Sequence, residues 1–152
     1  MYFVDREKIE QILLYMEKCL KTFESEKNWS GHTGRLALER LGHVLIEAVI
    51  DVGNQMIDGF IMRDPGSYAD ILDILADERV VSAQDAEQLK AFVAERNAVV
   101  RTYASVPHRR LAETIQQSRE ALGRFPEQVR RYLTEELGPV SAFLPREQGT
   151  GE

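Results

Sequence analysis

Basic and aromatic side chains that could contact a phosphate gather in one segment of the chain. Arg96, Arg101 and Tyr103 lie within eight residues, Asn97 follows the first arginine directly, and His108 comes five residues after the tyrosine. A guanidinium group stays charged near neutral pH, and its planar fork matches two phosphate oxygens. In one continuous helix Arg96 and Tyr103 would share a face, and Arg101 would project about 140° from Arg96. The segment predicts phosphate binding, but it also fits a structural role in which the side chains complement a helix dipole.

A second set of polar side chains forms a narrow stripe on an otherwise apolar helix: His43, Glu47, Asp51, Asn54 and Asp58. The first three could supply nitrogen and oxygen ligands to a divalent metal. The chain lacks the Glu-x-x-His repeat of helical metal sites, and its three histidines lie in separate segments. We therefore expect no metal and no cofactor, and we interpret Asp51 and Asn54 as lining a cleft. Cys19 has no histidine near it in sequence, which favours packing over nucleophilic catalysis.

The elements that must position these side chains are helices, because apolar residues recur at three- and four-residue steps almost throughout. Ser67-x-x-Asp70 and Ser82-x-x-Asp85 are capping boxes in which the first residue caps the helix and the fourth reaches back. The expected helices run from the N-cap Asp5 to about Ser25, from about Arg35 to Ile61, over Tyr68 to Asp77, over Ala83 to Tyr103, and from Pro107 onward with a kink or close restart at Pro126. The prediction is an all-α, antiparallel bundle of about five helices spanning 1–137, followed by a flexible tail, 138–152.

Composition limits the function classes. The 152 residues are 43% hydrophobic and 29% charged, which predicts a globular domain. A formal net charge of -6 excludes general coating of nucleic acids, so RNA contact needs a local basic cluster. The single cysteine, the lack of a signal peptide pattern and the lack of a long apolar stretch predict a cytoplasmic protein that does not enter a membrane. The second helix is apolar over more than half its circumference, which favours a homodimer that buries part of it.

Several of these patterns together resemble the HepT-like family of HEPN-domain proteins, which are small bacterial and archaeal helical bundles. The resemblance covers roughly residues 4 to 137 and includes the opening Val4-Asp5-x-x-Lys8-Ile9 and the stretch from Ala48 to Ile57. Family members commonly carry Arg, four residues, His, one residue, Tyr. Arg96 matches the arginine, Asn97 the frequent asparagine after it and Tyr103 the tyrosine, whereas Arg101 occupies the histidine position.

The resemblance implies a homodimer in which the motifs of two subunits face one cleft and cut RNA without a metal. The family acts as the toxin half of a toxin-antitoxin pair, whose other half is a small MntA-like nucleotidyltransferase antitoxin. In the family the motif tyrosine receives adenylyl groups that silence the toxin, and Tyr103 is the residue onto which this role carries.

The arginine at the histidine position puts cleavage in doubt. Cutting RNA requires a base for the 2'-hydroxyl proton and an acid for the leaving oxygen, and a guanidinium offers no acceptor lone pair. Loss of such a group costs about 10²- to 10⁴-fold in rate. We therefore expect a cleft of Arg96, Asn97, Arg101 and Tyr103 that binds RNA and cuts it weakly or not at all.

Two other interpretations stay open. His108 follows Arg101 in a looser arginine-histidine spacing and could contact RNA or replace the missing imidazole, but Pro107 argues against this because it starts a new helix. Alternatively, the protein is a non-catalytic dimerisation module that binds a nucleotidyltransferase partner.

Overall fold

The computed structural model describes residues 2–138, and all of the regular secondary structure in this part of the chain is helical. It contains six α-helices, one more than the approximate number predicted, and two short helices of other types: α1 Arg6–Ser25, α2 Gly31–Gly59, α3 Tyr68–Asp77, α4 Ala83–Val93, the π-helix η1 Asn97–Arg101, the 3-10 helix η2 Tyr103–Ser105, α5 His108–Gln117 and α6 Arg119–Leu137. The all-α prediction is confirmed. Apart from Gly138, the predicted tail 138–152 lies outside the described residues.

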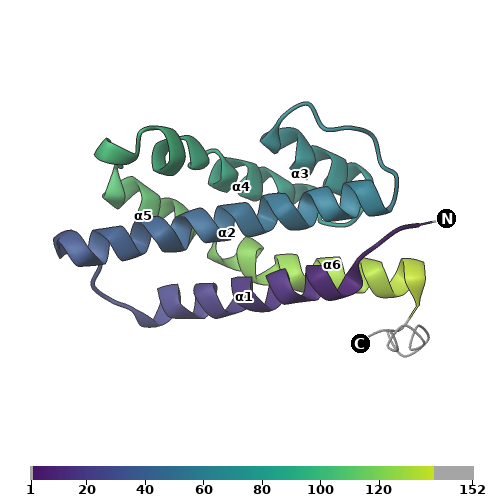
Figure 1. Ribbon diagram of the computed structural model, residues 1–152, viewed down its shortest axis with the longest axis horizontal. Coiled ribbons are helices and arrows are strands. Elements are labelled where there is room, and N and C mark those ends of the chain that lie inside the picture. The colour runs from purple at the N-terminus through teal and green to yellow at the C-terminus, as the bar shows by residue number, and fades with distance from the viewer. Residues whose placement is uncertain (1, 139–152) are drawn as a thin grey trace.

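The long helix α2 is the centre of the bundle. It packs against α1, α3, α4, α5 and η1, while α6 lies along α1 on the other side of the molecule (Figure 1). Thirteen of its residues are buried, including Leu45, Val49, Val52 and Met56, so most of its circumference is covered within one chain. No helix in the described part is both long and apolar enough to cross a membrane.

The ends of α2 differ from the prediction. The helix begins at Gly31 rather than Arg35, because Ser30 takes the extended N-cap conformation. It ends at Gly59 rather than Ile61, because Ile61 adopts a left-handed conformation with φ 56° and Met62 N–H donates to Ile57 O at 2.9 Å. This is a Schellman C-cap, in which glycine is the usual residue at the left-handed position.

Close approach between α2 and α3 requires a glycine. A Cβ atom at Gly53 would lie 2.4 Å from Cγ2 of Ile71, well inside van der Waals contact. The two helices therefore pack backbone against side chain at this point.

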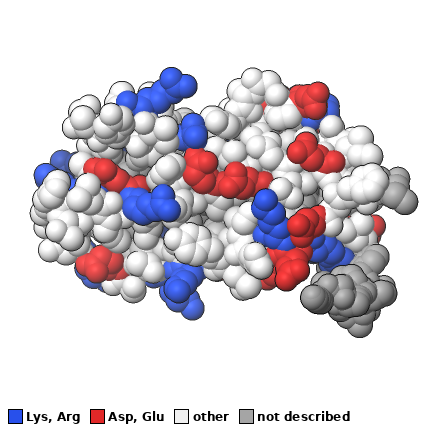
Figure 2. All heavy atoms as spheres, viewed as in Figure 1, with Lys and Arg blue, Asp and Glu red and all other residues white. Residues whose placement is uncertain are grey.

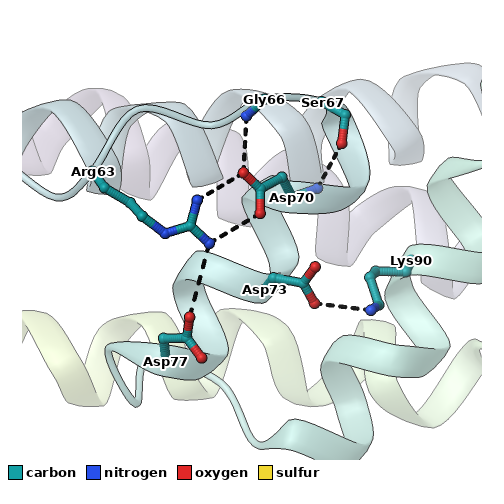
Figure 3. Close-up of polar contacts among 7 residues, drawn as sticks. All are labelled: Arg63, Gly66, Ser67, Asp70, Asp73, Asp77 and Lys90. Carbon is teal, nitrogen blue, oxygen red and sulfur yellow. Dashed lines mark hydrogen bonds and ion pairs between the residues drawn. The ribbon is translucent and has the colours of Figure 1, made fainter.

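Each predicted capping box forms only one of its two hydrogen bonds. The hydroxyls of Ser67 and Ser82 accept from the backbone N–H of Asp70 and Asp85, as predicted. The aspartates do not reach back to the cap residues. Asp70 instead accepts from Gly66 N–H at 2.9 Å and from both terminal nitrogens of Arg63, which fastens the α2–α3 loop (Figure 3).

The carboxylate of Asp85 points toward α6 rather than back to the N-cap residue Ser82. It is 4% exposed and accepts from Arg124 at 2.8 and 2.9 Å and from Gln128 at 2.7 Å. Gln128 takes over the reach-back contact, because its side-chain oxygen accepts from Ser82 N–H at 2.9 Å. A long-range network therefore joins the start of α4 to α6.

The predicted single helix from Ala83 to Tyr103 is wrong. Helix α4 stops at Val93, and the chain continues through η1 and then η2. The buried carboxylate of Glu95 sits at this break, where it accepts from the guanidinium of Arg110 at 2.9 Å and from the hydroxyl of Thr114 at 3.2 Å. These contacts hold the end of α4 against α5.

The interruption of the final helix lies at Ser118 and not at Pro126, which is inside α6. Ser118 is fully buried, and its hydroxyl oxygen accepts from the side-chain amide of Gln88 at 2.9 Å. The proline does not end the helix, because residues before and after it are buried against the core. Pro107 precedes α5 directly, as expected for a residue that favours a helix start.

Candidate functional site

One edge of α2 carries four ionisable side chains at successive four-residue steps: Glu39, His43, Glu47 and Asp51. We call this set the α2 polar edge. A four-residue step advances about 6 Å along a helix and keeps neighbouring side chains on one face. Figure 2 shows acidic side chains in a row over the middle of α2 with basic ones close by. Two members of this edge, Glu39 and Glu47, contact side chains from other parts of the chain, His108 and Arg96.

Arg96, just before η1, binds the centre of this edge. Its Nε donates to Oε2 of Glu47 at 2.6 Å, and its guanidinium carbon lies 4.8 Å from the centre of the Tyr68 ring. The hydrogen bond to Glu47 raises the pKa of Arg96 above its ordinary value. Within residues 2–138, no hydrogen bond occupies the two terminal nitrogens of Arg96. The guanidinium is thus anchored through one edge while its outer edge can receive an anion.

The π-helix places the rest of the motif on the surface. Thr102 N–H donates to Asn97 O at 3.2 Å, a step of five residues that differs from the four-residue step of an α-helix. Asn97, Arg101 and Tyr103 are all exposed, and Tyr103 is 71% exposed. The expectation that Arg96 and Tyr103 share a face assumes a continuous α-helix, which the chain does not form between these residues. Arg101 is likewise no longer separated from Arg96 by the α-helical 140°.

His108 lies elsewhere along the same edge. Its Nε2 is 2.6 Å from Oε2 of Glu39, the first member of the α2 polar edge. Glu39 precedes Glu47 by two helical turns, or about 12 Å along the axis. The structure therefore does not bring His108 to the anchor of Arg96, and Pro107 separates it from η1 as its sequence position indicates.

His43 and Asp51 flank the anchor on α2. Nε2 of His43 is 3.5 Å from the same Glu47 oxygen that binds Arg96. Partial burial and the negative charge of Glu47 raise the pKa of Asp51, opposed by the positive charges of Lys8 and Arg96. Proton-accepting side chains therefore stand on both sides of the carboxylate that holds the arginine.

An open groove of about 310 Å³ runs between α1 and α2 beside this anchor. Its walls are mainly apolar, and its lining residues are Gln11, Ile12, Tyr15, Val44, Glu47, Ala48 and Asp51. Asp51 is among the lining residues of this groove, whereas Asn54 is not. In the described part of the chain no group of three or more histidine, cysteine or acidic side chains is arranged to hold a metal ion.

Sequence reasoning missed the residues that hold Arg96. The sequence marks Tyr68 only as the start of a helix, and Glu47 only as a member of the polar stripe and a possible metal ligand. The four-residue spacing of the stripe is the available signal, but it cannot identify a partner 49 residues away.

Comparisons with known proteins agree with this architecture. The profile of the family described as Ribonuclease HepT-like matches residues 6–129. The chain is 51% identical over 143 residues to a Bacillus subtilis (strain 168) protein described as "Putative RNase YutE", with 94% of this chain and 99% of that protein covered.

Solved structures give the same picture of the fold. The structure of YutE, described as a cytosolic protein of unknown function, superposes with a TM-score of 0.89 at 50% identity and covers 91% of this chain and 97% of that chain. A tri-AMPylated HEPN toxin from Shewanella oneidensis, solved in complex with its MNT antitoxin, superposes with a TM-score of 0.71 at 19% identity, covering 81% and 96% of the two chains.

Proposed function

Because the chain belongs to the HepT-like ribonuclease family, we propose that it binds RNA at the η1 segment and acts as a weak, metal-independent endoribonuclease toxin. Arg96 contacts the phosphate of the backbone, and the observation that carries this role is its geometry. Glu47 and Tyr68 fix the guanidinium, while its outer nitrogens make no hydrogen bond within residues 2–138. A fixed guanidinium loses little conformational freedom when it binds an anion.

Asn97, Arg101 and Tyr103 complete the RNA contact in this proposal. All three are exposed on consecutive turns beyond Arg96, where they can reach neighbouring nucleotides. Arg101 adds positive charge but moves no proton, because its guanidinium has no lone pair to accept one. We therefore expect cleavage well below that of a protein with histidine at this position. The two motifs of a homodimer would face one cleft.

The partner in this proposal is an MntA-like nucleotidyltransferase antitoxin that adenylylates Tyr103. The phenol is 71% exposed, so it can enter the active site of another protein. Incubation with a cognate nucleotidyltransferase and ATP should add adenylyl mass to the intact protein, and Tyr103→Phe should remove the addition. An unchanged mass of the parent chain would contradict the modification.

The cleavage assay uses a fluorescent oligoribonucleotide and the purified full chain. Arg96→Ala should abolish the slow cleavage, and Arg101→His should raise the rate at least tenfold, because it restores an imidazole. Arg131→Ala, which removes an exposed arginine from α6, is the matched control and should leave the rate unchanged. Cleavage that is fast in the parent chain and unaffected by Arg96→Ala would refute the assignment.

A second candidate is a non-catalytic module that dimerises and binds the nucleotidyltransferase alone. The neutralisation of Arg96 by Glu47 and the net charge of -6 favour it. This candidate predicts co-purification with the partner and no RNA affinity at low salt. RNA binding that weakens steeply with added salt would exclude it.

A further inference from the structure

We propose that His43 is the residue that accepts the proton of the attacking 2'-hydroxyl during RNA cleavage. This inference rests on the proposed ribonuclease function and concerns a group outside the arginine-tyrosine motif. Position 101 holds an arginine, so any proton transfer at this site needs an imidazole or carboxylate from another element.

The geometry centres on one oxygen atom. Oε2 of Glu47 lies 2.6 Å from Nε of Arg96 and 3.5 Å from Nε2 of His43. The imidazole and the guanidinium therefore lie within reach of a single bound phosphodiester, because each is next to the same atom. The side chains are 24% (Arg96), 31% (Glu47) and 32% (His43) exposed, so solvent and substrate can reach all three.

The carboxylate also favours one tautomer of the imidazole. With the hydrogen on Nε2, 3.5 Å from Oε2 of Glu47, the lone pair of the neutral ring lies on Nδ1. Glu47 thus lies beside both the phosphate-binding group and the base.

The step is a transesterification. Nδ1 of His43 takes the proton from the 2'-hydroxyl, the 2'-oxygen forms a bond to phosphorus, and the bond from phosphorus to the 5'-oxygen breaks. Water protonates the departing 5'-oxygen, and the resulting hydroxide takes the proton back from His43. The products are a 2',3'-cyclic phosphate and a free 5'-hydroxyl, with no oxidation or reduction.

The other two histidines are placed less well. Nε2 of His108 is held at 2.6 Å by Glu39, about 12 Å along α2 from Glu47. His32 is exposed in the first turn of α2, eleven residues before His43, or about 16 Å along the axis. The chain has three histidines in all, so His43 is the imidazole nearest to the anchor of Arg96.

The test replaces each histidine with glutamine in the full chain. Single-turnover cleavage of an oligoribonucleotide is measured for His43→Gln, His108→Gln and His32→Gln, and affinity is measured with the 2'-O-methyl form of the same oligonucleotide, which cannot be cut. We expect His43→Gln to reduce the rate about 10²- to 10⁴-fold with affinity changed less than threefold. His32→Gln is the control from the same helix and should match the parent chain.

A second measurement separates chemistry from structure. Free imidazole should raise the rate of His43→Ala at least tenfold, because it fills the space of the missing ring, and a purely structural role would give no such rescue.

Different results would refute the proposed function and the assignment of His43. The proposed function fails if the parent chain does not bind the uncut oligonucleotide, if Arg96→Ala binds it equally well, or if the parent chain does not cut RNA. The His43 assignment alone fails if the parent chain cuts RNA in a manner that depends on Arg96 but His43→Gln cuts at the parent rate, or if His108→Gln reduces the rate more than His43→Gln does.

Discussion

Three glycines inside helices provide a graded test of the packing that supports the site. A Cβ atom would lie 2.4 Å from Ile71 at Gly53, 3.2 Å from Leu111 at Gly42 and 3.9 Å from Leu20 at Gly123. Alanine at each position gains up to about 1 kcal/mol because it removes the conformational freedom that glycine has in the unfolded chain. The steric cost differs from one position to the next, so the net changes in unfolding free energy should differ in sign.

The cost in free energy of an alanine at Gly53 follows from its contact with Ile71. Ordinary van der Waals separation starts at 3.4 Å, so the neighbouring atom must move by about 1 Å. That atom is Cγ2 of Ile71, which is 2% exposed and belongs to a β-branched side chain with one preferred rotamer in a helix. The strain cannot be relieved by a side-chain rotation, and helix α3 must shift. Overpacking of this kind costs roughly 1 to 3 kcal/mol, which exceeds the gain.

Urea unfolding followed by circular dichroism measures the three substitutions. Gly53→Ala should lower the unfolding free energy by up to about 2 kcal/mol, and Gly123→Ala should raise it by up to about 1 kcal/mol. Gly42→Ala should fall near zero, because the end of the Leu111 side chain can give way. An increase in stability for Gly53→Ala equal to that for Gly123→Ala would refute the described contact between α2 and α3.

Three further predictions concern charges and backbone strain. Arg63 lowers the pKa of Asp70 to about 2, so the stabilisation from Asp70 is complete above pH 4 and disappears as the pH falls through 2. The thermal unfolding temperatures of the parent chain and of Asp70→Asn should therefore converge between pH 4 and pH 2. A difference that stays constant over this interval would contradict the contact. Ile61→Gly should raise the unfolding free energy in urea by up to about 1 kcal/mol, because φ at this exposed position is 56°, and a decrease in stability would disprove the strain. Asp85→Asn should lower the unfolding free energy by about 1.5 to 3 kcal/mol, since it removes a buried acceptor of charge-assisted bonds from Arg124, and a change below 0.5 kcal/mol would show that the network is dispensable.

Local signals in the sequence are sufficient to predict most of the fold. The caps at Asp5, Ser67 and Ser82 and the limits of Tyr68–Asp77 follow from hydrogen bonds between near neighbours, which a sequence pattern reports directly. The family resemblance is also confirmed, because the family profile matches residues 6–129.

The errors have a common cause in long-range contacts. Helix α4 breaks where Glu95 binds Arg110, and the final helix is interrupted where Ser118 binds Gln88. Each contact joins residues far apart in sequence, so periodicity shows a continuous helix where tertiary hydrogen bonds interrupt it.

The candidate site, too, can be predicted only as far as local sequence signals reach. The type and position of Arg96 identify it in the sequence, but its orientation depends on Glu47 and Tyr68 from two other helices. The predicted relation of Arg96 to Arg101 assumes a continuous α-helix, whereas Asn97–Arg101 forms a π-helix, which has no simple sequence signature.

The salt dependence of RNA binding tests the central claim most directly. If the outer nitrogens of Arg96 contact a phosphate, the logarithm of the association constant for a single-stranded RNA should fall linearly with the logarithm of salt concentration. Arg96→Ala should bind more weakly and make the slope shallower by about 0.7 for each phosphate that the variant no longer neutralises. Equal affinity and equal slope for the two proteins between about 50 and 200 mM salt would contradict the account.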